Sequence, residues 1–243
     1  MSDVDTAAAT EDDKPAPKWK PLTSLERRVL GVLGEKAKTT PDSYPLSLNA
    51  LVNGCNQQSN RYPQMNVESI DVENALEKLR AIGAVSEVHG GGRVAKYKHY
   101  LYEWLGVSKT ESAVMIELLL RGSQTVGELR GRAARMEPIK DVAELRPIVA
   151  ELIERGLVLS LTAEGRGQIV THALYREEEM DKVRARAAEA AEAAASAAPV
   201  KRSSSSSSSS SSNNALEREV QELKAEVARL RGEIEDIWKN IQG

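Results

Sequence analysis

The stretch LRAIGAV at residues 79–85 is followed by a glycine-rich segment at 90–92 and then by RVAKYKHY at 93–100. The same arrangement returns later in the chain. LIERGLV at 152–158 precedes a second glycine-bearing segment at 165–167 and QIVTHALY at 168–175. In each copy a helical pattern ends at a glycine, and two strand-like runs flank a glycine-bearing turn. Because internal repeats set the architecture of a chain, the sequence predicts two copies of a helix followed by a β-hairpin.

Two shorter helical patterns precede each of these helices. In the first copy they begin at the capping box Thr23–Glu26 and at Ser47, and the third helix covers residues 69–82. In the second copy, capping boxes begin at Ser108, Thr125 and Asp141. Three helices and a twisted hairpin are the layout of a winged helix-turn-helix. Pro147 lies inside the last helical pattern, where proline removes a backbone hydrogen bond, so we expect a kink there or a helix that restarts.

We therefore expect a mostly α protein with small β-hairpins, an α+β fold of tandem winged helix-turn-helix domains, followed by a flexible linker and a C-terminal coiled coil. The expected parts are a disordered tail at 1–20, winged-helix domains at 21–106 and 107–180, an Ala/Ser-rich linker at 181–213 and a coiled coil at 214–243. A solvated, partly frayed helix is expected over 177–198, because the segment is rich in Ala, Glu and Arg but poor in large apolar residues. The serine run at 203–212 predicts flexibility, because serine buries nothing.

The C-terminal segment carries a strict heptad pattern, with β-branched residues at the a positions and mostly leucine at the d positions. This combination favours a parallel two-stranded coil. The flanking pairs Glu219–Lys224 and Glu226–Arg231 are attractive in a parallel homodimer. The alternative is an amphipathic helix that docks on its own globular part. The expected dimer interface consists of Leu216, Val220, Leu223, Val227, Leu230, Ile234, Ile237 and Ile241.

Composition argues against several other classes of protein. The formal net charge of the 243 residues is −3, which is not the strongly basic balance of an obligate nucleic-acid binder. The three histidines are scattered and Cys55 is the single cysteine, so we expect no metal site, and no nucleophile motif appears. We expect no enzyme activity and no cofactor. With no signal peptide and no apolar run long enough for a bilayer, we expect no membrane contact and a cytoplasmic location.

The best candidate surface for nucleic acid joins the first hairpin to the polar segment after the second helix. Arg93, Lys96 and Lys98 alternate along one strand and share a face, where they would neutralise phosphates. From the polar segment, Asn56, Gln57, Asn60 and Arg61 are the expected additional DNA-binding residues, because amides can bind adenine edges. The alternative is a solvated hairpin and a polar turn.

Several segments resemble a known bacterial family: LNALVNGCNQQSNR at 48–61, GGGRV at 90–94, EWLG at 103–106, GELRGR at 127–132 and RM at 135–136. They are similar to the YceH-like family over about residues 22–176. The resemblance implies a tandem winged-helix fold, no enzymatic activity, no cofactor and a biochemical role that is not established. Pro147 departs from the family pattern, and the serine-rich and heptad segments lie outside the match.

Two functions follow from these observations. The first is a dimeric tandem winged-helix protein that binds duplex DNA as a regulator. The second is a protein–protein interaction scaffold, which the acidic third helix of the first copy would suit, since Glu68, Asp71, Glu73 and Glu77 outnumber its basic residues. A continuous basic face that joins Arg61 to the hairpin lysines would favour DNA, and a broken one would favour the scaffold.

Overall fold

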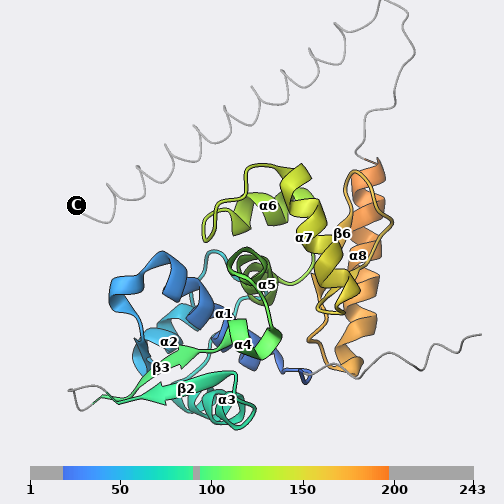
Figure 1. The fold of residues 1–243 in the computed structure, drawn as a ribbon. Coiled ribbons are helices and arrows are strands. Elements are labelled where there is room, and N and C mark those ends of the chain that lie inside the picture. Colours follow the sequence, from blue (N-terminus) through green and yellow to red (C-terminus); the bar gives the residue numbers. More distant parts are fainter. Residues whose placement is uncertain (1–18, 90–93, 197–243) are drawn as a thin grey trace, which may run out of the picture. The chain divides into compact units, whose positions relative to one another are not determined.

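The computed structural model describes residues 19–89 and 94–196. The chain divides into two compact units, residues 1–197 and 198–243, and all described residues belong to the first. Within them the expected class is confirmed: the fold is mostly helical with small antiparallel sheets, an α+β arrangement consistent with a winged helix (Figure 1). The predicted coiled coil at 214–243, its interface residues and the serine run lie outside the described residues.

The first repeat contains three helices and three strands, with a short 3-10 helix between the first helix and the first strand. Its elements are α1 (Ser24–Thr39), η2 (Pro41–Ser43), β1 (Leu46–Ser47), α2 (Leu48–Cys55), α3 (Ser69–Ala81), β2 (Val85–Val88) and β3 (Lys96–His99).

The second repeat follows the same order after a short connecting helix, α4 (Leu101–Leu105). Its elements are α5 (Lys109–Arg121), β4 (Gln124–Thr125), α6 (Val126–Ala133), α7 (Val142–Glu154), β5 (Val158–Ser160) and β6 (Ile169–His172). One further helix, α8 (Glu177–Ser196), completes the described part of the chain.

The two sheets have the same topology. Their strand orders are β1-β3-β2 and β4-β6-β5, and all neighbouring strands are antiparallel. The central strand of each sheet is the last strand of its repeat. The two-residue strands β1 and β4 were not expected from the sequence, because two residues are too few to show a period-2 pattern. They tie the start of α2 and of α6 to the hairpins.

Local sequence signals place the helix ends. Capping boxes form at Thr23, Ser108 and Thr125 as predicted. At Asp141 only half of the box forms, because the Glu144 carboxylate accepts from the backbone N–H of Lys140 instead. The helix-ending glycines Gly83 and Gly156 both adopt positive φ, which few side chains tolerate.

The helix α7 runs from Val142 to Glu154 through Pro147. Of the two expected alternatives, a kink or a restart at this proline, the restart is therefore wrong. Asp141 caps one helix that begins five residues before the proline, and its side chain accepts from the Glu144 N–H.

The first helices of the two repeats, α1 and α5, pack directly against each other (Figure 1). Glycines on α1 allow this close approach. A Cβ added at Gly31 would lie 2.9 Å from the Leu120 side chain, and one added at Gly34 would lie 2.7 Å from Ile116. The buried apolar side chains of both repeats form one continuous core. The two repeats are thus held together by a shared hydrophobic interface as well as by the chain.

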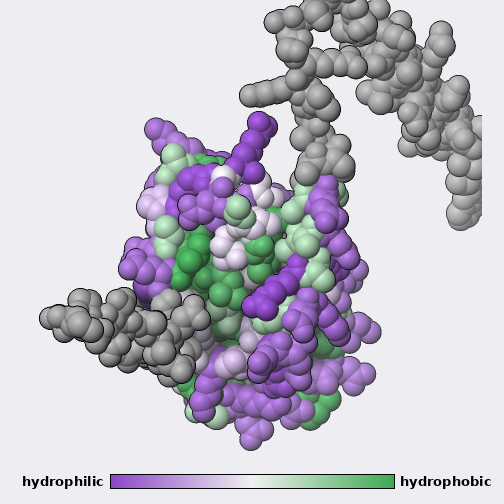
Figure 2. Space-filling view, turned by 90° about the vertical axis from the view of Figure 1, so that its right-hand side faces the viewer, coloured by the Kyte–Doolittle hydropathy of each residue, from purple (hydrophilic) through white to green (hydrophobic). Residues whose placement is uncertain are grey.

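The helix α8 follows the second repeat and contacts the first repeat. The sequence predicted a solvated helix here but not this contact. Glu179 accepts two hydrogen bonds from Arg27 on α1, at 2.9 and 2.6 Å. Ala187 is buried, although most of the helix is exposed. Figure 1 shows α8 beside the second repeat, and Figure 2 views the molecule from this side. The Arg27–Glu179 ion pair, the buried Ala187 and the Arg186 guanidinium over the Tyr62 ring therefore attach this helix.

Candidate functional site

Two of the predicted DNA-binding residues lie on β3 as expected. Lys96 is exposed and pairs across the sheet with Val88, and Lys98 pairs with Ser86. The ammonium of Lys98 lies 5.0 Å from the centre of the Tyr100 ring, a cation–π distance. Arg93 lies outside the described residues. The hairpin therefore presents two lysines at alternate positions of one strand.

Arg61 does not join this surface. Its side chain is buried, and it forms a two-point ion pair with Glu35 on α1, at 2.5 and 3.2 Å. Its Nε also donates to the Gly54 carbonyl oxygen at 3.0 Å. An arginine tolerates burial when a carboxylate and carbonyl oxygens take its N–H groups. The expected basic face through Arg61 is therefore broken at this residue.

The amide side chains near Arg61 bind the loop in which they lie. Asn56 donates to the Val67 carbonyl oxygen and accepts from the Val67 N–H, both at 2.8 Å. Gln57 donates to the carbonyl oxygen of Ser59 at 3.1 Å. These contacts occupy the groups that were expected to bind base edges. They give the loop between α2 and α3 a defined shape.

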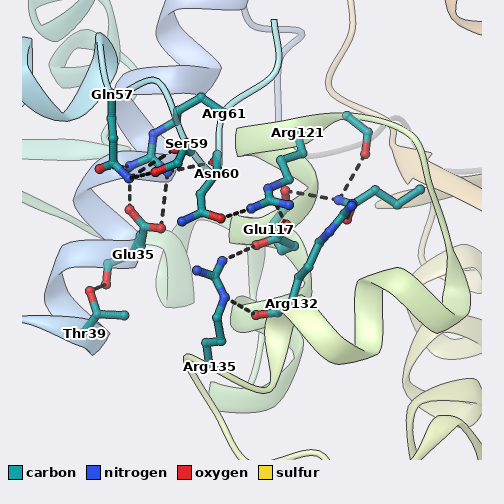
Figure 3. A network of polar contacts seen from close by, with 12 residues as sticks. Glu35, Thr39, Gln57, Ser59, Asn60, Arg61, Glu117, Arg121, Arg132 and Arg135 are labelled. Carbon is teal, nitrogen blue, oxygen red and sulfur yellow. Dashed lines mark hydrogen bonds and ion pairs between the residues drawn. The ribbon is translucent and has the colours of Figure 1, made fainter. Parts of the chain in front are cut away.

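Asn60 connects this loop to the second repeat. It adopts a φ of 61°, a left-handed conformation that asparagine tolerates better than most residues. Its side-chain oxygen accepts a hydrogen bond from Arg121 on α5 (Figure 3). The neighbouring Tyr62 N–H donates to the carbonyl oxygen of Leu120 at 2.9 Å. The family-like stretch that ends at Arg61 thus forms part of the contact between the repeats.

A fully buried carboxylate, Glu117, lies at the centre of the polar network in Figure 3. Arg135 donates to it at 3.3 Å. Arg121 Nε lies 3.1 Å from its Oε1, an ion-pair distance without hydrogen-bond geometry. Burial raises the pKa of Glu117, and the adjacent guanidinium groups oppose that shift without cancelling it. Arg121 and Arg135 thus lie within ion-pair distance of a buried carboxylate.

The exposed face of α3 is acidic. Both of its basic residues lie near carboxylates, with Lys78 at 3.9 Å from Glu26 and Arg80 at 2.7 Å from Glu87. Glu73 and Glu77 are exposed and form no ion pair within the described residues. The unpaired charge on the surface of this helix is therefore negative.

The corresponding helix of the second repeat, α7, has a similar balance of acidic and basic side chains on its surface. Glu151 and Glu154 are exposed, and Arg146 donates to the Gly165 carbonyl oxygen at 3.0 Å. Glu151 lies 3.8 Å from Arg155, and an ion pair with a solvent-exposed carboxylate contributes little to stability. Neither third helix presents the basic surface that duplex DNA would require.

A cavity of about 820 Å³ lies between α1, the loop after α2, the β4–α6 corner and α8. Its walls carry many arginines, including Arg28, which was not among the residues predicted from the sequence. Arg28 follows Leu25 by three residues and precedes Val32 by four, so its position on the apolar face of α1 was visible in the spacing. The return of α8 over this region had no comparable signal.

A metal site requires a cluster of ligating side chains, and a membrane span requires a long apolar helix. Within residues 19–89 and 94–196, no group of three or more His, Cys, Asp and Glu side chains is arranged to hold a metal ion. None of the helices in these ranges is both long enough and apolar enough to cross a bilayer.

Comparison with known proteins gives a family and several close relatives. Residues 22–166 match the family model described as "Protein of unknown function, DUF480". A UPF0502 protein of Rhodopirellula baltica is 52% identical over 190 residues, which cover 76% of this chain and 78% of the relative. A UPF0502 protein of Pelobacter propionicus is 54% identical over 135 residues, which cover 56% of this chain and 62% of the relative. One of Geobacter sulfurreducens is 48% identical over 134 residues, which cover 55% and 61%.

Proposed function

We propose that this chain, which belongs to the DUF480 family of proteins of unknown function, is a non-enzymatic tandem winged-helix protein that binds a protein partner. The expected membership of a bacterial family of unestablished role is confirmed by the matched relatives. Within the proposal, the repeats act as one body and the exposed face of α3 takes a basic segment of the partner. The location of the complex is cytoplasmic.

The charge on α3 is the observation that carries this proposal. In DNA-binding winged helices the third helix enters the major groove, where it must meet phosphates. Here the two basic residues of that helix lie near Glu26 and Glu87, while Glu73 and Glu77 form no ion pair with any residue that the structure describes. Like charges repel, so this face favours a cationic partner over duplex DNA. The burial of Arg61 supports the same choice, because it removes a cation from the surface.

Duplex DNA remains the second candidate, since Lys96 and Lys98 lie together on β3. In that case the hairpin, and not α3, would bind the phosphates. Each Lys→Ala substitution that leaves one phosphate without its cation would reduce the slope of log affinity against log salt by about 0.9.

Dimerisation through the heptad segment is part of the proposal. A parallel coil would bring two copies of the winged-helix pair together and raise the apparent affinity for a multivalent partner. Its support is the spacing of the eight apolar residues between Leu216 and Ile241 and the attractive flanking charges.

The test compares two probes on the full chain, a fluorescent duplex DNA and a fluorescent lysine-rich peptide, by anisotropy across a salt series. We expect the peptide to bind and the double variant Glu73→Gln/Glu77→Gln to weaken it, because the variant removes the unpaired carboxylates. The matched control is Glu151→Gln/Glu154→Gln on α7. Tight DNA binding that is lost in Lys96→Ala/Lys98→Ala would refute the protein-partner proposal in favour of the second candidate.

A further inference from the structure

The cavity between the repeats has walls from three separate parts of the chain. Arg28 and Tyr62 come from the first repeat, Arg132 comes from α6, and Lys182 and Arg186 come from α8. Its volume of about 820 Å³ is large enough for a small organic molecule.

Positive charge dominates the lining. The basic side chains on its walls are Arg27, Arg28, Arg61, Arg121, Arg132, Lys182 and Arg186. Four of these have a carboxylate within ion-pair distance, in the pairs Arg27–Glu179, Arg61–Glu35, Arg121–Glu117 and Arg132–Glu128. Within the described residues, no carboxylate pairs with the other three, which are Arg28, Lys182 and Arg186. The cavity therefore carries an excess of positive charge.

Arg28 is the most informative of these residues, because its side chain is almost completely buried, at 1% exposure. Its terminal nitrogens donate to the carbonyl oxygens of Cys55 and Pro63, at 2.9 and 2.6 Å, and its Nε has no hydrogen-bond partner. Burial, and next the charge of Arg61, lowers the pKa of Arg28 to about 10. A buried charge without a counter-ion is costly, and an anion in the adjacent cavity would offset that cost.

The remaining walls are suited to an apolar or aromatic body. Met65, Val183 and Ala187 line the cavity, and the Tyr62 ring lies on its wall with the guanidinium of Arg186 at 4.6 Å from the ring centre. On the side of the molecule that carries α8, hydrophobic residues lie among hydrophilic ones (Figure 2). A ligand for these walls needs both a charged group and an apolar part.

We propose that this cavity binds a small organic phosphate monoester, with its doubly charged phosphate near Arg28, Lys182 and Arg186 and its apolar or aromatic body against Tyr62. A phosphate dianion compensates three unpaired cations better than a single carboxylate does, and arginine suits its geometry. Because both repeats and α8 supply the walls, the bound ligand would hold α8 in place. This binding site is independent of the acidic face of α3, so either proposal can fail without the other.

The experiment titrates the full chain by calorimetry with phenyl phosphate and adenosine monophosphate at low salt. Inorganic phosphate lacks the body and phenol lacks the charge, so these two probes separate the two parts of the site. We expect both esters to bind with a Kd below about 1 mM, and inorganic phosphate and phenol to bind at least about tenfold more weakly.

Variants on α8 test the location. Lys182→Ala/Arg186→Ala should weaken binding of both esters at least about tenfold, because two of the three unpaired cations are removed. The matched control is Arg184→Ala, on the same helix but outside the cavity lining. It should change the affinity by less than about twofold. All variants should keep the far-UV circular dichroism spectrum of the parent chain, because these side chains are exposed.

Three results would overturn the proposal. One is a failure of both esters to bind at millimolar concentration. Another is an affinity for inorganic phosphate equal to that for the esters, which would show charge attraction without a built site. The third is an equal loss of affinity in Arg184→Ala and in Lys182→Ala/Arg186→Ala.

Discussion

Two histidines at equivalent positions of the two repeats should make this protein less stable at mildly acidic pH. His99 pairs with Val85 in the first sheet, and His172 pairs with Val158 in the second. The Nδ1 atom of His99 accepts from the Leu101 N–H at 3.1 Å, and that of His172 accepts from the N–H two residues later at 3.2 Å. A nitrogen that accepts carries no proton, so both contacts require the Nδ1 atom to be unprotonated.

The direction of the effect follows from burial. Burial lowers the pKa of His99 to about 4, and burial, followed by the charge of Arg27, lowers the pKa of His172 well below its usual value. In the unfolded chain both groups take up a proton near pH 6.5. Below that pH the unfolded state binds protons that the folded state does not, so stability falls as the pH falls. Between pH 7 and pH 5 the loss is about 2 kcal/mol for His99, and His172 adds a loss in the same direction.

Urea denaturation of the full chain at pH 7 and pH 5 measures this loss. His99→Asn and His172→Asn each keep an acceptor oxygen but remove the titrating group. Each should abolish part of the pH-dependent loss, and the double variant should abolish most of it. Burial raises the pKa of Glu117, which acts in the opposite direction, but this carboxyl is common to all variants and cancels in the comparison. If the double variant loses as much stability as the parent chain between these pH values, the reasoning is wrong.

Three further results are expected. Arg61→Leu leaves Glu35 buried without its counter-ion and should lower the free energy of unfolding, measured by urea denaturation, by about 3–5 kcal/mol. Adding Glu35→Leu should recover part of this loss. A loss under about 1 kcal/mol would contradict the buried pair. Gly34→Val should cost about 1–3 kcal/mol, because a side-chain carbon of α5 lies 2.7 Å from the new Cβ. The control Gly131→Ala has no atom within 4 Å of the new Cβ and should stabilise α6 by up to about 1 kcal/mol, as thermal melts would show. Leu223→Pro should break the expected coiled-coil helix and convert a full-length dimer into a monomer, as sedimentation equilibrium would show. A 1–197 fragment that dimerises as well as the full chain would refute dimerisation through the coiled coil.

Several elements could be predicted because their signals are local. Capping boxes at Thr23, Ser108 and Thr125 depend on residues three positions apart, so the sequence alone locates these helix starts. The glycines that end α3 and α7 need positive φ, which few other residues tolerate. The half-formed box at Asp141 shows the limit, because the Glu144 side chain reaches a different backbone N–H from the expected one.

The candidate site was less predictable, because burial is a property of the whole fold. Arg61 and its neighbouring amides have the composition of a nucleic-acid surface, and their types and spacing do not show whether a carboxylate lies nearby. Glu35, which lies 26 residues before Arg61 in the chain, meets it only after α1 and the loop have packed. That long-range contact turns an expected phosphate ligand into a structural ion pair.

By itself, the sequence determined the order of helices and hairpins, their repetition and most helix ends, because these depend on contacts between residues close in the chain. Only the tertiary structure decided which polar residues remain exposed. The close packing of α1 on α5 buries the pair Arg61–Glu35 and the carboxylate of Glu117, and the return of α8 completes a basic cavity. The physical reason is that desolvation and ion pairing depend on every group that approaches a side chain, and here those groups come from distant parts of the chain.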